Sequence, residues 1–505
     1  MEIDGTGSPG EIWMQQAVHK AIRNPMVPLF LLFLTIYVSS AGGHLYSIDE
    51  VIIYSTTQAI ANSGSLNIAF ALPLIHSLGF LTWVPENTSA YYSKYGLLQP
   101  VLALPLYYLG TWLGITQWRV VDLLYSPIMS AASVCLVFAI SRRLGRSTAI
   151  SVAVSLLYGF ATIAWPYAKF FYEVTTASAM LLATTYFLFD PATRRSSTLL
   201  SGLFATLSVF ARITQTIVLP AIFLYLVFKR PRSRQSIVNA ALFLIPVAAG
   251  AMVYAYLNLA RFGSPLDFGY LGEGNLFSEG YMMNPIIGAY GMLLSSGEGL
   301  FIYYPLCAVG LSTLLGASSK SDENWPRFIF AWFFFANLLF FARYSAWHGW
   351  GAWGARFLVI CTPYLILASA PFLESAKTSI VKTVTLIFAT GMGAFSNLMG
   401  VIINFNYTQA YLVGLGAYDL SRFPEPGIWI PTFSPLRGSW ILLWSQTYAE
   451  FYSYAPAIFF LKGRYDLLLF NVLGLPALLV TAVLAILETY WLAGTLRTSN
   501  SRSHD

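Results

Sequence analysis

The strongest constraint on this chain is a series of long apolar runs, which recur from one end of the sequence to the other. The run 236–259, for example, contains no Asp, Glu, Lys or Arg. A helix needs about 20 such residues to cross the hydrocarbon core of a bilayer. Hydrophobic residues make up 57% of the 505 and charged residues only 10%, whereas soluble domains carry roughly 25% charged residues. The sequence therefore excludes a soluble enzyme, a disordered chain and a nucleic-acid-binding domain.

The apolar runs predict an all-α, polytopic integral membrane protein with about 12 transmembrane helices. The stretch 97–115 is apolar but interrupted by Pro100 and Pro105, and we expect it to form interfacial helices in the first outer loop rather than a span. The predicted spans are 26–43, 120–141, 147–165, 174–189, 198–211, 213–228, 236–259, 300–317, 327–342, 357–373, 380–402 and 467–492.

The positions of the Lys and Arg residues predict the orientation of these spans. Basic clusters lie at 142–146, 194–195 and 229–234, and all three fall on one side only when 97–115 does not cross the membrane. Cytoplasmic loops hold an excess of Lys and Arg. We therefore place these clusters and both termini in the cytoplasm.

This orientation divides the chain into four predicted parts. These are a cytoplasmic N-terminal segment at 1–25, a catalytic transmembrane domain at 26–403 that includes the outer loop 44–118, an outer loop at 404–466, and a last helix with a cytoplasmic tail at 467–505. The outer segments are rich in Gly, Pro, Tyr and Trp, which indicates ordered elements over the outer face. The three cysteines lie in apolar runs without metal-ligand spacing, and we interpret them as core residues.

Two adjacent carboxylates, Asp49 and Glu50, follow the first predicted span. They either begin a solvated segment, where a helix dipole favours them, or provide a general base at the membrane surface. Adjacent residues on a helix point about 100° apart. We therefore expect one carboxylate to face a cavity while the other holds neighbouring structure, and we favour Asp49 for the cavity.

Two lysines lie among tyrosines in predicted outer segments. Tyr92 and Lys94 precede the interfacial stretch, and Lys169 and Glu173 lie between the third and fourth spans. A lysine ringed by tyrosines serves either as an interface anchor or as a point charge that binds a phosphate. Glu173 either makes a local surface ion pair, supports a base or an acceptor, or ligates a divalent cation.

The arginines at predicted outer ends of spans form a third set. Arg212 lies between two apolar runs, where it must snorkel, pair or face a water-filled cavity. The outer loop 343–356 begins with Arg343, ends with Arg356 and contains His348, three Trp and three Gly. Its tryptophans are either an aromatic belt or stacking surfaces for a sugar, and its arginines suit phosphate oxygens.

With these motifs in place, the chain resembles the membrane-embedded glycosyltransferases of the C-type fold, a class that includes protein O-mannosyltransferases and the bacterial lipid A aminoarabinose transferase. The resemblance covers most of 26–360 and is carried by Asp49-Glu50, Ser93-Lys94-Tyr95-Gly96, Arg142-Arg143-Leu144-Gly145-Arg146, Glu173 and the stretch Trp347 to Arg356. The family often has Pro after the Lys, whereas Tyr95 and Gly96 stand here.

The resemblance implies an inverting transfer of a sugar from a polyprenyl-phosphate donor to a glycan, lipid or protein acceptor. Asp49 would deprotonate the acceptor hydroxyl, with Glu50 and Glu173 as further acidic groups, and Lys94 would contact the lipid phosphate. Tyr92, Lys169, Arg212, Arg343, His348 and Arg356 are substrate-binding candidates from charge and location. No cofactor is required, although Mg²⁺ or Ca²⁺ suits the carboxylates. We expect a plasma-membrane protein whose site faces outside the cytoplasm.

Two other functions remain as alternatives. A transporter or flippase of a lipid-linked sugar would need a cavity that alternates between sides, often with inverted repeats. The sequence shows no repeat, and its candidate residues concentrate at one face. An inactive scaffold that binds lipid-linked sugars would need no base, so Asp49→Asn would leave its function unchanged.

Overall fold

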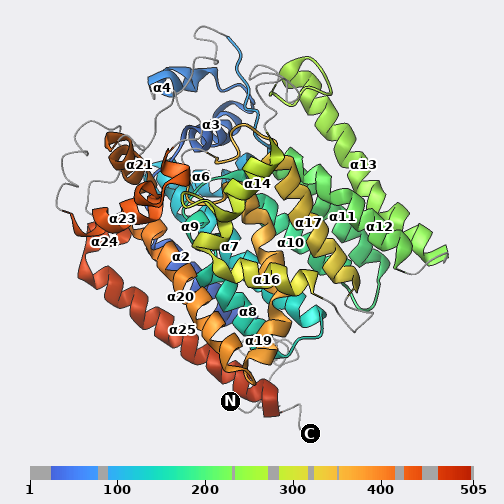
Figure 1. The fold of residues 1–505 in the computed structure, drawn as a ribbon. Coiled ribbons are helices and arrows are strands. Elements are labelled where there is room, and N and C mark those ends of the chain that lie inside the picture. The colour runs from blue at the N-terminus through green and yellow to red at the C-terminus, as the bar shows by residue number, and fades with distance from the viewer. Residues whose placement is uncertain are drawn as a thin grey trace, which may run out of the picture.

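A computed structural model of the chain describes residues 24–77, 89–229, 234–270, 284–316, 324–349, 352–415, 426–445 and 465–501. These residues are mostly helical (Figure 1), and their isolated β-bridge joins Asn67 to Tyr92. The predicted all-α class is confirmed. Residues 1–23 of the predicted N-terminal segment and 446–464 of the predicted outer loop 404–466 lie outside the described residues.

Within the described residues, five helices are long and apolar enough to cross a membrane, and this makes the chain a multi-pass membrane protein. They are α7 (Gln117–Arg143), α13 (Arg234–Phe262), α17 (Asn324–Ala342), α20 (Ile380–Ile402) and α25 (Leu475–Ser501). A sixth span forms if η5 (Arg356–Cys361) and α18 (Thr362–Ala368) are joined to α19 (Ala370–Ala376), across a bend of 41°.

Several other predicted spans form helices of 10–17 residues. A helix of 14 residues such as α2 (Met26–Ser39) is only about 21 Å long, shorter than a hydrocarbon core of about 30 Å. The count of about twelve spans therefore stays a prediction. The other predicted spans with helices of this length are α8 (Thr148–Ala161), α10 (Glu173–Leu188), α11 (Arg195–Ala211), η2 with α12 (Ile213–Val218, Leu219–Phe228) and α16 (Pro305–Leu315), and the apolar helix α14 (Pro285–Leu294) has 10 residues.

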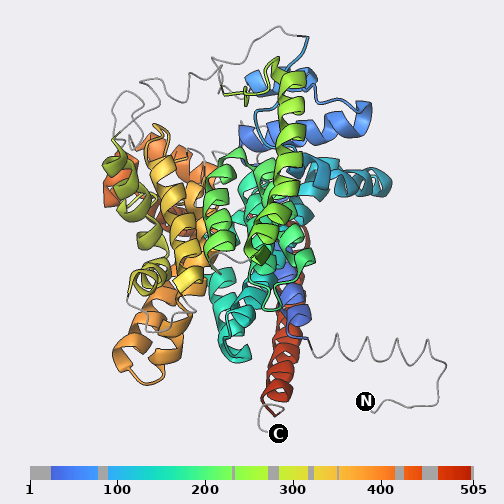
Figure 2. The same ribbon diagram turned by 90° about the vertical axis from the view of Figure 1, so that its right-hand side faces the viewer.

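The remaining short helices lie mostly between the long ones. They are α3 (Ile48–Ser63), η1 (Ala69–Ala71), α4 (Leu72–Ser77), α5 (Leu98–Leu102), α6 (Leu104–Leu113), α9 (Ala164–Tyr167), α15 (Leu300–Tyr303), α21 (Phe405–Gly414), α22 (Pro426–Trp429), η6 (Pro431–Phe433), α23 (Pro435–Trp444) and α24 (Leu468–Leu473). The stretch predicted to be interfacial forms α5 and α6, and Figure 2 shows α6 running across the direction of the long helices.

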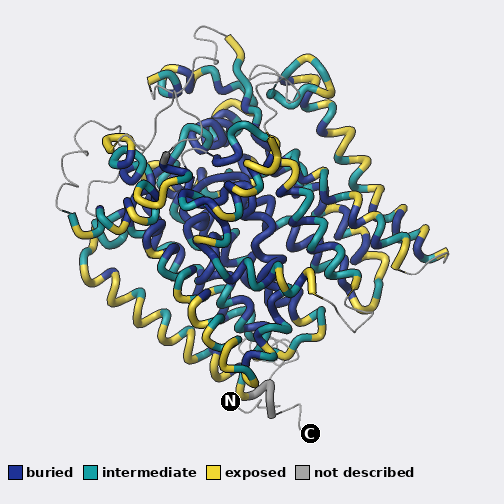
Figure 3. The backbone as a smooth tube through the Cα atoms, viewed as in Figure 1, coloured by how far each residue is buried: buried dark blue, intermediate teal, exposed yellow. Residues whose placement is uncertain are grey.

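Burial divides the long helices into a central group and a peripheral group. The centre, around α7 and α10, is almost wholly buried, whereas α13 and α25 expose apolar side chains along their length (Figure 3). Exposed apolar helices suit contact with lipid tails, because lipid is as apolar as the side chains themselves.

The order of the helices decides where the candidate residues meet. The chain runs up α2 and begins α3 at the upper end in Figure 1, and α7, α8, α10, α11, α12 and α13 then alternate in direction. The start of α3, the start of α10 and the end of α11 consequently lie at one end of the bundle. The packing of η5 against α10 and α17 brings Arg356 to the same end.

Candidate active site

The start of α3 fixes the positions of the two adjacent carboxylates. The Ser47 hydroxyl accepts a hydrogen bond from the Glu50 N–H at 3.3 Å, and Glu50 Oε2 accepts one from the Tyr46 N–H at 2.8 Å. Ser-x-x-Glu is the sequence of a capping box, in which both residues bond free amides at the helix start. Glu50 is fully buried in this role. The side chain of Asp49, one position earlier, takes no part in these hydrogen bonds.

Asp49 pairs with Arg356, which lies 307 residues later in the chain. The Arg356 Nη2 atom is 2.5 Å from Asp49 Oδ2, and Nη1 donates to the Gly349 carbonyl at 3.2 Å. The guanidinium lies over the Tyr172 ring, 4.2 Å from its centroid. A carboxylate, a carbonyl and an aromatic face therefore hold the guanidinium in one orientation.

Lys94 lies on a loop that packs closely against the end of α11. A Cβ atom on Gly96 would come within 2.2 Å of the Ala211 carbonyl oxygen, so only glycine permits this approach. The Lys94 ammonium is 5.4 Å from the centroids of both the Tyr95 and Tyr270 rings. The close packing holds the loop that carries Lys94 against the end of α11, and Arg212 is the residue that follows this end.

Arg212 connects this loop to the second acidic group. Its Nε atom is 3.6 Å from Glu173 Oε1, and its guanidinium lies 4.9 Å from the centroid of the Phe341 ring. Glu173 is the first residue of α10, and its Oε2 atom is buried without a hydrogen-bond partner among the described residues. A buried polar oxygen of this kind costs about 1–3 kcal/mol, so Glu173 has the capacity to accept a further hydrogen bond.

The positive charges decide the protonation state of Asp49. Burial alone would raise the pKa of the Asp49 carboxyl, but the charges of Arg356 and Lys94 outweigh burial and hold the pKa below its ordinary value. Burial raises the pKa of Glu50 well above its ordinary value. Burial also lowers the pKa of His348 to about 4, so His348 is neutral at pH 7. The environment thus favours the ionised form of Asp49 and the neutral form of Glu50.

Lys169 belongs to a second buried group of charged residues, with Asp466 as its partner. Its ammonium donates to the Val401 carbonyl at 2.6 Å, to the Asp466 carbonyl at 2.9 Å and to Asp466 Oδ2 at 2.8 Å. A lysine has three protons to donate, and these contacts use all of them. The geometry leaves Lys169 no proton with which to bind a substrate phosphate.

Two other residues that the sequence suggested for substrate binding lie outside the group of charged residues around Asp49 and Arg356. Arg343 is exposed just after the end of α17, and the half-buried Tyr92 forms the backbone bridge to Asn67. The structure therefore brings together Asp49, Glu50, Glu173, Lys94, Arg212 and Arg356, with His348 one residue before Gly349 in the loop that contacts Arg356.

Sequence reasoning missed three residues that the structure places at or beside the site. Tyr172 lies under Arg356, and the Tyr95 hydroxyl hydrogen bonds to Asp49 and so helps to lower the pKa of that carboxyl. Both adjoin residues that sequence analysis singled out, and that adjacency was a usable signal. Asp466, the partner of Lys169, had none, because nothing near it in the sequence relates it to residue 169.

The carboxylates do not form a metal-binding group. Among the described residues, no three His, Cys, Asp or Glu side chains are arranged to hold a metal ion. Glu50 Oε2 accepts from the Tyr46 N–H, and Asp49 pairs with Arg356. The Mg²⁺ or Ca²⁺ ion considered from the sequence therefore stays a prediction.

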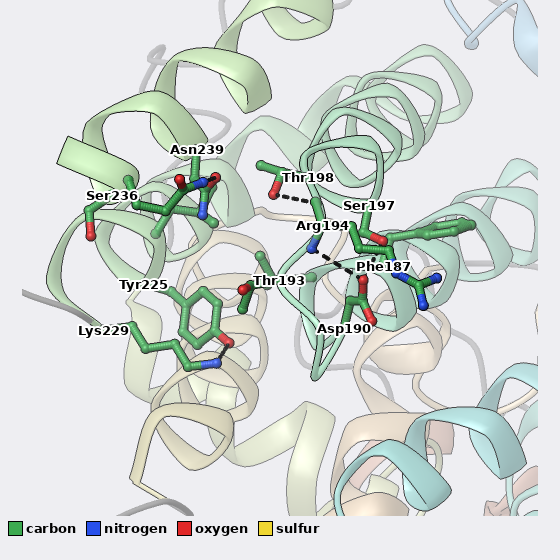
Figure 4. A pocket seen from close by; sticks show the side chains of 13 residues that line it. Phe187, Asp190, Thr193, Arg194, Ser197, Thr198, Tyr225, Lys229, Ser236 and Asn239 are labelled. Carbon is green, nitrogen blue, oxygen red and sulfur yellow. Dashed lines mark hydrogen bonds between the residues drawn. The ribbon is translucent and has the colours of Figure 1, made fainter. Parts of the chain in front are cut away.

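A cavity of about 40 Å³ lies at the opposite end of the bundle, between the α10–α11 turn and the facing ends of α12 and α13 (Figure 4). Asp190 lines it, but its carboxylate already accepts hydrogen bonds from the Ser197 hydroxyl at 2.6 Å and the Arg194 amide at 3.4 Å. The Lys229 ammonium donates to the Tyr225 hydroxyl at 2.6 Å. None of the candidate residues lines this cavity.

Comparison with known proteins finds similarity only among solved structures. No family model and no curated protein matches the chain. ArnT from Cupriavidus metallidurans in the apo state is 12% identical and aligns over 97% of this chain and 78% of that chain, with a TM-score of 0.48. The same protein bound to undecaprenyl phosphate is 12% identical over 82% and 75%, with a TM-score of 0.45. An Archaeoglobus fulgidus oligosaccharyltransferase in complex with Zn and sulfate is 12% identical over 80% and 56%, with a TM-score of 0.45.

Proposed function

We propose that this chain is a membrane-embedded glycosyltransferase that moves a sugar from a polyprenyl-phosphate donor to an acceptor hydroxyl. The observation that supports this most directly is the ion pair of Asp49 with Arg356, 2.5 Å apart, with the charge of Lys94 also acting on Asp49. A transferase of this kind needs a carboxylate for the acceptor and cations for the departing phosphate. The cluster offers both groups at one end of the bundle.

The cations match the chemistry of the leaving group. A polyprenyl phosphate departs with a negative charge, so it needs positive groups in place where that charge develops. Lys94 supplies a point charge, and the planar guanidinium of Arg356 suits phosphate oxygens. Arg212, which is balanced by Glu173 at 3.6 Å, supplies a third positive charge beside them.

Asp49 provides the group that receives the proton. An acceptor hydroxyl is a weak nucleophile, and a carboxylate within hydrogen-bond reach assists it by general base catalysis. The lowered pKa of Asp49 keeps its carboxylate ionised at neutral pH, which is the form that accepts a proton. The nearby cations also reduce its basicity, so donor phosphate that draws Arg356 away would strengthen the base.

The proposed reaction is a single displacement. The bond from the anomeric carbon to the phosphate oxygen breaks with its electron pair on the phosphate, while a new bond forms to the acceptor oxygen. The acceptor proton passes to Asp49. One displacement inverts the anomeric carbon, so no second nucleophilic carboxylate is needed, and Glu173 would position the acceptor.

The proposal places this reaction at the outer face of the plasma membrane. The upper end of the bundle, where Asp49 lies, is opposite the turn that carries Arg194 and Arg195 and the end of α12 at Lys229. Basic segments of this kind mark the cytoplasmic side. The same one-sided arrangement favours a transferase over a flippase, since alternating access needs a site near the midplane.

A transfer assay tests the function. Purified protein is supplied with a panel of sugars on undecaprenyl and dolichyl phosphate and with glycan, lipid and peptide acceptors. Asp49→Asn is run beside it, with Asp190→Asn at the opposite end of the bundle as the matched control. We expect transfer by the wild type and by Asp190→Asn, and loss of transfer with retained donor binding in Asp49→Asn. Transfer by Asp49→Asn at the wild-type rate contradicts the proposal.

A further inference from the structure

We infer that Asp466 is a positioning residue for the active site, because it joins the two loops from which the site residues project. The inference rests on the proposed function. Asp466 comes from the segment just before α24 and is 3% exposed. Its carboxylate does not reach Asp49 or Arg356, so its effect on the reaction passes through the two loops.

The first loop leads into α3. Asp466 Oδ1 is 2.7 Å from His44 Nε2, and the neighbouring Leu468 N–H donates to the Ala41 carbonyl at 3.0 Å. Two residues after His44, the Tyr46 N–H donates to Glu50 in the helix cap. Fixing His44 therefore fixes the start of α3, and with it the direction of Asp49.

The second loop leads into α10. Asp466 Oδ2 is 2.8 Å from Lys169 Nζ, which also donates to the Asp466 carbonyl. Tyr172, whose ring lies under Arg356, follows three residues later, and Glu173 follows next. Fixing Lys169 therefore fixes the aromatic surface under one partner of the ion pair and the carboxylate beside Arg212.

The backbone on either side of this contact is tightly packed. A Cβ atom on Gly42 would lie 2.1 Å from the Tyr46 hydroxyl oxygen and 3.0 Å from Asp466 Oδ1. The Asp466 N–H donates to the Ile402 carbonyl at 2.8 Å, at the end of α20. The side-chain carboxylate therefore contacts His44 and Lys169 while the backbone is held by α20, so both the side chain and the main chain of Asp466 are fixed in place.

The decisive measurement separates kcat from KM in Asp466→Asn, with activity expressed per folded protein. Asparagine keeps the shape but loses the charge that holds both Lys169 and His44. A misplacement of about 1 Å costs roughly 100-fold in rate, so we expect kcat to fall by about that factor while the donor KM is unchanged. Glu374→Gln, which removes one carboxylate from the exposed Arg146–Glu374 pair at 3.1 Å, is the matched control and should keep both constants. An unchanged kcat in Asp466→Asn overturns the inference.

A second variant covers the case in which Asp466→Asn does not fold. The double variant Lys169→Met with Asp466→Leu replaces the buried ion pair by apolar groups, a change that proteins often tolerate. It should fold and still lose about 100-fold in kcat, because no directional contact holds the loops. Wild-type kcat in the folded double variant rejects a positioning role.

Hydrogen exchange distinguishes failure of this inference from failure of the proposed function. If the wild type transfers no sugar from any donor, the proposed function fails, yet exchange still reports on the loops. Asp466→Asn should then speed exchange of the amides at 41–47 and 168–173 and leave those of α8 unchanged. Equal exchange in variant and wild type overturns the inference whatever the activity.

Discussion

Two buried ion clusters lie near one another at the upper end of the bundle, and they differ in how fully their groups are used. The Asp466 cluster consists of His44, Lys169 and Asp466. Its side chains are 1–2% exposed, and the Lys169 ammonium has three hydrogen-bond acceptors. In the Asp49 cluster, the Asp49 side chain is 20% exposed, and Glu173 keeps an oxygen without a hydrogen bond among the described residues. The first cluster is closed, whereas the second keeps some solvent exposure and an oxygen that can accept a further hydrogen bond.

The difference separates a structural role from a chemical one. Charges with every hydrogen bond satisfied hold the chain in one arrangement, and they have no bonding capacity left for a substrate. Charges that keep some access and unused capacity can exchange partners when an anion or a hydroxyl arrives. Substitutions in the open cluster should therefore alter activity more than stability, and substitutions in the closed cluster should alter stability as well.

The largest effect should come from Asp49→Asn. General base catalysis contributes about 10²–10⁴-fold, and we expect kcat to fall by that factor with little change in melting temperature. Thermal unfolding in detergent, run beside the transfer assay, checks both quantities. A variant that loses its fold together with its activity would show that Asp49 belongs with the closed cluster.

Lys169→Met should show the opposite pattern. It leaves the Asp466 carboxylate buried without its ammonium partner, and removing one partner of a buried pair costs about 3–5 kcal/mol. We expect a large drop in melting temperature and, at a temperature where the protein stays folded, no change in donor affinity. A weakened donor affinity with a normal melting temperature would instead show that Lys169 contributes to substrate binding.

Arg356→Lys tests whether the shape of the guanidinium matters beyond its charge. A lysine keeps the charge but cannot stack on Tyr172 and bond Asp49 and Gly349 in one plane. We expect a loss of about 100-fold in kcat/KM, by analogy with the removal of one preorganised donor. Steady-state kinetics over a range of donor concentrations measure it, and an unchanged kcat/KM would mean that charge alone suffices.

The smallest effect should come from Glu50→Gln. The raised pKa of Glu50 favours its neutral form in the folded protein, and glutamine imitates that form while its oxygen accepts from Tyr46. Because the folded pKa is raised, wild-type stability should fall as the pH rises from the ordinary value of 4.5 towards the folded pKa, and then level off. The variant lacks this decline, and melting temperatures measured across that range should show it. Glu50→Ala, which leaves the buried Tyr46 N–H without its acceptor, should cost about 1–3 kcal/mol.

The sequence was sufficient for the class of protein and for much of the site. Apolar runs predict helices in a membrane, and charges at span ends single out Asp49, Lys94, Glu173, Arg212 and Arg356, because charges there need partners or water. The sequence could not say which arginine faces Asp49. That choice depends on the packing of η5 against α10, which brings together residues about 300 positions apart.

Other features could not be read from local pattern at all. The length of an apolar run does not set the length of its helix, since the predicted span 26–43 contains the 14-residue helix α2. Lys169 resembles Lys94 in sequence, since each lies among tyrosines, yet a carboxylate 297 residues later takes up the charge of Lys169. Only the three-dimensional path of the C-terminal segment distinguishes the two lysines.

Gly96 has a consequence for how the site moves. Its backbone lies very near the carbonyl oxygens of Phe210 and Ala211. The loop that carries Lys94 and the end of α11 are therefore expected to move as one rigid unit. A tilt of α11 would then displace the Lys94 ammonium and the Arg212 guanidinium together. The distances from both cations to a bound anion would change at the same time.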